Sequence, residues 1–266
     1  TAYSAAKDFI NNLDQKENDY NASLKKFVSD LYEKQCRNNE RYFLDKTPRY
    51  YLIIDEIVNL FPEAKFIFLF RNPVHVYASV VTTWGNNRFN KIRSSYDDIV
   101  LGSKLLSEGY LKHKDKSLSV NYENFVTDFE TELKRITDYL DLEFSESMLH
   151  NFQTQDTKGS LGDPTGINKY ASISSQSINN WKGVFNSGLR KRFALILLNK
   201  IDSKDLETQG YSKPQITKEI RSLKIKINFR FFRDSIDYFN NFLTRKFKLN
   251  LLFSNKFSWI KKKYIS

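Results

Sequence analysis

The feature that most constrains the fold is an apolar run that ends directly at a helix start. Lys65-Phe66-Ile67-Phe68-Leu69-Phe70 is continuous and of strand length, which is typical of a central strand of a parallel sheet with both faces covered. The run stops at Arg71-Asn72-Pro73, where Asn72 is a good N-cap and Pro73 a good first helical residue. The sequence therefore predicts a strand followed at once by a helix over about residues 73–84.

Other segments continue this alternation. Residues 41–45 and 117–121 are predicted as short strands. A helix with Thr47 as N-cap is predicted to follow the first and to end at Pro62, and a helix with apolar positions from Phe125 to Leu140 to follow the second. Residues 1–38 carry apolar side chains at helical spacing. This order predicts an α/β fold with a mostly parallel central sheet flanked by helices.

The positive charge of the chain is concentrated at one end. Of 42 basic and 31 acidic residues, 13 and 3 lie in residues 216–266, a net charge of +10 there and +1 in the remainder. We therefore expect a body of residues 1–212 and a basic, aromatic-rich C-terminal extension of residues 213–266. Because the body is nearly neutral, its composition gives no reason to expect nucleic acid as a partner.

The C-terminal extension has two patterns. Residues 223–231 alternate apolar and polar side chains, which predicts a strand, and Phe232, Ile236, Phe239, Leu243 and Phe247 recur at helical spacing. A basic amphipathic segment of this kind suits an anionic membrane surface or a polyanionic acceptor. The favoured interpretation is that its apolar side packs on the body or on a neighbouring subunit.

Several classes of protein are excluded by composition. All 9 glycines lie at or after Gly85, and neither a dinucleotide fingerprint nor a Walker A loop occurs anywhere in the chain. The single cysteine, Cys36, excludes an internal disulfide and a thiolate zinc site and fits a reducing compartment. No apolar run reaches the roughly 18 to 20 residues that span a bilayer.

The segment from Lys65 to Ser79 carries the clearest candidate site. A buried strand delivers Arg71 to the start of a helix whose second turn carries Ser79. Free backbone N–H groups gather at such a start, and an arginine fork with a hydroxyl suits a phosphate. The alternative is that Arg71 only caps a surface turn while Ser79 packs on the helix.

Several segments together resemble the PAPS-dependent sulfotransferase superfamily, in which the Arg and Ser of Arg-x-Pro-x-x-x-x-x-Ser hold the 3′-phosphate of the donor. Arg71-Asn72-Pro73 with Ser79 matches that pattern, and Asp45-Lys46-Thr47-Pro48 resembles the Lys-Ser/Thr-Pro segment upstream of it. The other similar segments are Val120 to Phe125, Ile136 to Glu143, Gly162-Asp163-Pro164, Asn180-Trp181-Lys182 and Gly210-Tyr211. The resemblance covers roughly residues 1–212 and implies a three-layer, P-loop-like α/β fold.

The resemblance also implies an activity and a set of residues. The expected reaction is transfer of a sulfuryl group from PAPS to an acceptor hydroxyl or amine, with no metal. Lys46 is the implied catalytic residue, against a solvated lysine as the alternative. The implied cofactor-binding residues, each with a packing or surface-loop alternative, are Arg71, Ser79, Tyr122, Lys158, Gly159, Gly162 and Asp163. His75, on the same predicted helix, is interpreted as structural.

One departure from the family pattern bears on the whole chain. Members normally begin with a strand and a Gly-containing loop around the 5′-phosphosulfate, and no glycine precedes Gly85. We therefore expect an N-terminally truncated sulfotransferase, with a non-catalytic 3′-phosphonucleotide-binding module or inactive fragment as the alternative. The general base stays open among acids such as Asp14, Glu17 and Asp19.

The sequence leaves partners and location as expectations. A glycan is the favoured acceptor, while lipid, peptide and small-molecule acceptors stay open. No signal peptide is visible, which favours a cytoplasmic location, and the basic extension adds the option of peripheral membrane contact.

Overall fold

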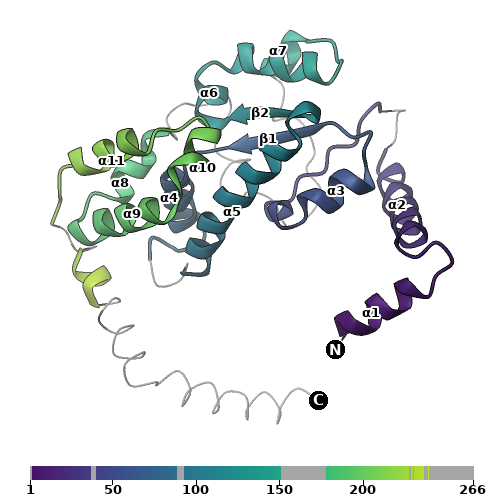
Figure 1. The fold of residues 1–266 in the computed structure, drawn as a ribbon. Helices are drawn as coiled ribbons and strands as arrows, with labels where there is room; N and C mark the ends of the chain where they lie inside the picture. The colour runs from purple at the N-terminus through teal and green to yellow at the C-terminus, as the bar shows by residue number, and fades with distance from the viewer. Residues whose placement is uncertain are drawn as a thin grey trace, which may run out of the picture. The chain divides into compact units, whose positions relative to one another are not determined.

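The structure is a computed structural model that describes residues 2–36, 40–88, 93–150 and 178–239, apart from 228, 230, 237, 238 and the side chains of 2, 3, 93 and 94. It divides into two compact units, Thr1–Phe66 and Ile67–Ser266, each described here on its own. In chain order the elements are α1 (Ala2–Asn11), α2 (Glu17–Glu33), η1 (Tyr50–Leu52), α3 (Ile54–Leu60), β1 (Phe66–Phe70), α4 (Pro73–Thr83), α5 (Arg93–Lys112), η3 (Lys114–Lys116), β2 (Ser117–Asn121), α6 (Tyr122–Thr127), α7 (Phe129–Tyr139), η4 (Glu146–Leu149), α8 (Asn180–Val184), α9 (Gly188–Lys200), α10 (Ser203–Thr208) and α11 (Lys213–Ser222) (Figure 1).

The first unit is helical, as its sequence predicts, but one predicted strand in it is wrong. Residues 41–45 form no strand, and the described sheet consists of β1 and β2. Their side chains contact residues on both sides in sequence instead: Phe43 stacks on Tyr32 with ring centroids 4.3 Å apart, and Asp45 accepts hydrogen bonds from the hydroxyls of Tyr32 and Tyr50. The helix predicted to begin after Thr47 forms later, as η1 and α3.

The strand and helix predicted around Arg71 are confirmed. β1 ends at Phe70, and α4 begins at Pro73 with Asn72 as its N-cap, whose side chain accepts a hydrogen bond from the Val74 N–H at 3.0 Å. β2 and the helices that follow it also form where the sequence predicts them. β1 and β2 lie side by side and point the same way, with helices between them in the chain (Figure 1). This is the parallel α/β arrangement that the alternation of elements indicates.

Burial of β1 is one-sided, which corrects the prediction of two covered faces. Phe68 and Phe70 are buried, and both contact Tyr110 of α5 edge to face with ring centroids 5.6 Å apart. Ile67 and Leu69 alternate with them and are 38% and 55% exposed. Among the described elements α5 covers one face of β1, so the apolar run alone overstated the burial of the strand.

The core of the second unit lies among its helices. The buried cluster takes residues from α4, α8, α9, α10 and α11, including Val74, Val81, Phe185, Leu197 and Ile220. Ile216 and Ile220 belong to α11, so the first helix after residue 212 packs into the same core as the helices before it. We expect this packing to make α11 part of the folding unit.

The strand predicted for residues 223–231 is also wrong. The described residues from Leu223 to Ile227 have no strand structure, and the backbone N–H of Lys226 donates to the carbonyl of Asn186 at 2.7 Å. An alternating pattern forms a strand only where an edge is available to pair with it, and this segment meets a loop carbonyl instead.

None of the helices described has both the length and the apolar character needed to cross a membrane. The same described residues hold no group of three or more His, Cys, Asp and Glu side chains positioned to bind a metal ion.

Candidate functional site

Arg71 and Tyr122 lie together at the carboxyl ends of the two neighbouring strands. Each residue comes directly after its strand, β1 or β2, and the ends of parallel strands meet at one edge of the sheet, where ligands bind in open α/β folds. The Arg71 guanidinium lies over the Tyr122 ring, 4.1 Å from its centroid. The Arg71 Nε is buried and has no hydrogen-bond partner among the residues that the structure describes. Two of the residues that the family resemblance implied are therefore in contact.

The start of α4 offers fewer free N–H groups than the sequence suggested. Pro73 has none, and the Val74 N–H is taken by the Asn72 side chain. Ser79 lies in the second turn of α4 and is half-buried. An anion at this position would therefore depend on the Arg71 side chain more than on the helix backbone.

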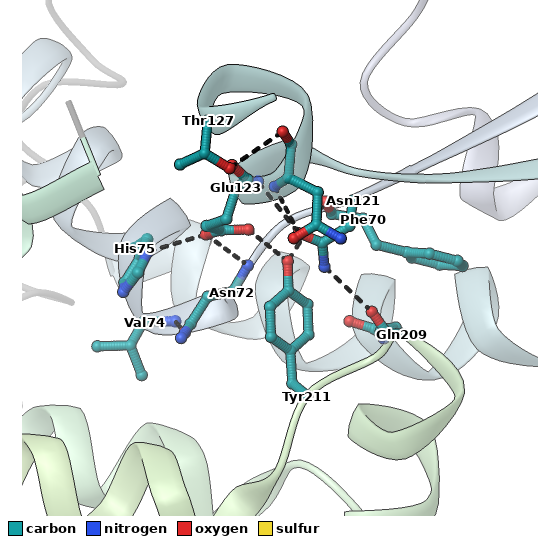
Figure 2. Close-up of polar contacts among 10 residues, drawn as sticks. Phe70, Asn72, Val74, His75, Asn121, Glu123, Thr127, Gln209 and Tyr211 are labelled. Atoms are coloured by element: carbon teal, nitrogen blue, oxygen red, sulfur yellow. Dashed lines mark hydrogen bonds and ion pairs between the residues drawn. The ribbon is translucent and has the colours of Figure 1, made fainter. Parts of the chain in front are cut away.

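Glu123 connects the two strand ends to a third segment (Figure 2). Its carboxylate accepts hydrogen bonds from the Asn72 backbone N–H at 3.3 Å, from His75 Nδ1 at 2.8 Å and from the Tyr211 hydroxyl at 2.5 Å. Since Asn72 follows Arg71 and Glu123 follows Tyr122, this one carboxylate fixes the backbone next to both members of the Arg71–Tyr122 pair.

The hydrogen bonds on Glu123 also set its ionisation. Burial, the largest single influence, raises the pKa of the Glu123 carboxyl, but the bonds from His75 and Tyr211 together outweigh it and lower that pKa below its usual value. Burial and the adjacent Glu123 charge raise the pKa of the Tyr211 hydroxyl. Glu123 is therefore held ionised, with Tyr211 as a neutral donor.

His75, interpreted as structural from the sequence, contacts both Glu123 and Trp181. It is buried, stacks on Trp181 with ring centroids 5.1 Å apart, and uses Nδ1 for Glu123. Its Nε2 is buried and, in the described part of the chain, has no hydrogen-bond partner. His75, Trp181, Glu123 and Tyr211 line a pocket of about 590 Å³ whose other walls include Lys182 and Gln215.

The turn before Tyr211 explains how that residue reaches Glu123. Gly210 has φ of +84°, a left-handed conformation that other residues rarely adopt. Next to it, the Gln209 carbonyl accepts from the Asn121 side chain at 3.5 Å, and that side chain also caps α6. The Gly210-Tyr211 pair noted in the sequence is therefore a turn that brings a distant tyrosine to the end of β2.

The remaining residues expected in the site divide into two groups. Lys46 is exposed in the first unit, next to Asp45. The four expected loop residues, Lys158, Gly159, Gly162 and Asp163, lie outside the described residues. No individual role was predicted from the sequence for Glu123 or Tyr211, although both lie inside segments that resembled the family, and His75 was interpreted as structural.

Comparison with known proteins identifies the family. A profile of the Sulfotransferase family matches residues 2–146, more than half of the chain. The chain belongs to this family.

Three similar proteins match this chain over different lengths and at different levels of identity. Nodulation protein NoeE of Sinorhizobium fredii is 48% identical over 46 residues, 17% of this chain and only 11% of that protein. A putative protein-tyrosine sulfotransferase of Caenorhabditis briggsae is 23% identical over 190 residues, 69% of this chain and 68% of that protein. The solved sulfotransferase domain from the curacin biosynthetic pathway superposes with a TM-score of 0.51 at 20% identity, covering 71% of this chain and 75% of that one. This last similarity confirms the fold.

Glu123→Gln should lower the free energy of unfolding by about 2 kcal/mol near neutral pH, because a neutral amide replaces a carboxylate that accepts three hydrogen bonds. The pKa of the Glu123 carboxyl is lower in the folded state than in the unfolded state, where it is about 4.3. The ionised carboxylate therefore contributes its full stabilisation above about pH 4.3, and this contribution is lost as the pH falls through the lower, folded-state pKa. The difference in the free energy of unfolding between the wild type and Glu123→Gln should therefore become smaller below about pH 4. Urea unfolding across this pH range measures it.

The matched control is Glu207→Gln, at an exposed position on α10, which should change stability little at any pH. A Glu123→Gln difference that stays constant down to about pH 3 would show that the ionised carboxylate is not what holds the network.

Proposed function

We propose that this protein transfers a sulfuryl group from PAPS to an acceptor hydroxyl or amine, with the Arg71–Tyr122 pair binding the 3′-phosphate end of the donor. The observation that carries the proposal is the position of the Arg71 guanidinium over Tyr122 at the carboxyl ends of β1 and β2. Membership of the Sulfotransferase family supports the reaction class.

The chemistry of the pair suits a phosphate dianion. Among the described residues the buried Arg71 Nε has no hydrogen-bond partner, and a bound oxyanion would satisfy this donor. Stacking on Tyr122 restricts the guanidinium to a plane, which reduces the entropy lost when it binds an oxyanion with two parallel hydrogen bonds. Ser79, two helical turns into α4, is the proposed second donor.

The residues have distinct roles in the proposed reaction. PAPS supplies an activated sulfuryl group, and transfer is in-line: the acceptor oxygen or nitrogen bonds to sulfur while the bond from sulfur to the 5′-phosphate breaks and 3′-phosphoadenosine 5′-phosphate leaves. Lys46 keeps the role that the family resemblance implies, which is to stabilise the oxygens that gain negative charge, and a base takes the acceptor proton. Asp14, Glu17 and Asp19 all stay open as that base; Asp19, in the first turn of α2, accepts a hydrogen bond from the Gln15 N–H at 2.8 Å.

The proposed acceptor is a carbohydrate hydroxyl. The name of the Caenorhabditis briggsae relative describes tyrosine as the acceptor of that protein, at 23% identity to this chain. A phenolic acceptor is therefore the second class that a transfer assay should include.

Calorimetric titration with 3′-phosphoadenosine 5′-phosphate tests the proposal, with adenosine 5′-phosphate as the matched control ligand. We expect binding to depend on the 3′-phosphate, with affinity at least about tenfold higher than for the control, since one charge-assisted contact accounts for about 1.5–3 kcal/mol. Equal affinity for the two nucleotides would contradict the assigned 3′-phosphate site. Binding of the 3′-phosphonucleotide without transfer from PAPS to either acceptor class would favour the non-catalytic binding module instead.

A further inference from the structure

Large apolar side chains of the C-terminal segment are exposed on the second unit. Six of them are between 58% and 81% exposed: Ile225, Ile227, Phe229, Phe232, Ile236 and Phe239. Single exposed apolar residues are ordinary on a protein surface, but a concentration within fifteen consecutive positions marks an interaction site.

The segment is held to the second unit by polar contacts that leave these side chains outside. Asp234 is 3% exposed and forms a buried ion pair with Arg190, which is fully buried. Arg233 Nη2 donates to the carbonyl of Asn87 at 2.6 Å, and the Lys226 backbone N–H donates to Asn186. Leu223 also packs against the core, but the six exposed apolar side chains take no part in these polar contacts.

The charge around the exposed side chains is mostly positive, although Asp237 lies between Ile236 and Phe239 in the sequence. Lys224 and Lys226 are exposed and alternate with Ile225 and Ile227. The charge of Asp234 is compensated by Arg190. After Asp237 the sequence has seven basic residues and no acidic one. We name the six apolar side chains with Lys224 and Lys226 the apolar-basic surface.

We propose that the apolar-basic surface docks on an anionic lipid bilayer. Interleaved lysines and large apolar side chains match the headgroup and acyl layers of such a membrane, since the first are attracted to acidic lipids and the second enter the interface. A protein partner would need apolar and acidic groups at positions that match this surface. An anionic bilayer has acidic headgroups and an apolar layer at every point of its surface. This proposal is independent of the donor site at Arg71.

Vesicle flotation of the full 266-residue chain tests the proposal. The probes are vesicles of phosphatidylcholine alone and vesicles with about one third phosphatidylserine. We expect binding to the anionic vesicles only, weakening as salt rises through about 0.5 M because surface charges are screened. Lys224→Gln with Lys226→Gln should weaken partition roughly 30-fold, at about fivefold for each basic residue.

A second variant removes apolar area without removing charge: Ile227→Ser, Phe229→Ser and Phe232→Ser together. All three side chains are exposed, so circular dichroism should show an unchanged fold, while partition should fall at least about tenfold. Leu111→Ser on α5, 50% exposed, is the matched apolar control, and Lys200→Gln with Lys204→Gln is the matched charge control. Failure to bind anionic vesicles overturns the proposal, and so does light scattering that shows a dimer abolished by the serine variant.

Discussion

Arg71→Ala should lower the affinity for 3′-phosphoadenosine 5′-phosphate at least about 100-fold, because it removes the guanidinium that lies over Tyr122 at the strand ends. Arg71→Lys should recover little of this affinity. A lysine keeps the charge but has no planar fork to bind two oxygens at once, and it loses the stacked geometry on the ring. Calorimetric titration of the two variants measures both effects.

The matched control for Arg71→Ala is Arg192→Ala, which removes the same charge from an exposed position on α9. The control should bind the nucleotide as wild type does, since a distant surface charge is screened. An equal loss of nucleotide affinity in the two variants would mean that net charge, and not the position of Arg71 at the strand ends, accounts for binding. Retained affinity in Arg71→Ala would remove Arg71 from the site.

The part of this site that could be predicted from the sequence is the part set by neighbouring residues. The apolar run before Arg71, the N-cap Asn72 and Pro73 each act within a few residues, and the strand and helix form as these signals predict. Parallel pairing then brings Arg71 to Tyr122, two residues that the family resemblance implied separately.

Contacts between distant segments could not be predicted in the same way. Glu123 meets Tyr211 across 88 positions and His75 across 48, and no periodicity records such pairs. The same limit produced the two wrong strands. Residues 41–45 and 223–231 have suitable side chains, but whether they form strands depends on a partner edge, and each makes other contacts.

Asp234→Ala should give the largest loss of stability, on the order of 3–5 kcal/mol, because it leaves the Arg190 guanidinium buried without its counter-ion. Arg190 also donates to the carbonyls of Asn87 at 2.6 Å and Val184 at 3.4 Å, but neutral carbonyls do not compensate the charge. In a unit of this size the melting temperature should fall on the order of 10 °C. Thermal unfolding followed by circular dichroism measures the change.

Two further variants separate the buried charge from the loss of a side chain. Glu207→Ala removes an exposed acid from α10 and should change the melting temperature by no more than about 2 °C. Replacing both partners, Arg190→Leu with Asp234→Leu, should recover most of the stability, since a buried ion pair contributes little beyond a well-packed apolar pair. If Asp234→Ala unfolds like wild type, the segment around Asp234 is not part of the cooperative unit. If it loses several kcal/mol, the basic C-terminal segment belongs to that unit at least as far as Asp234, because only a contact broken in the same transition can lower its melting temperature.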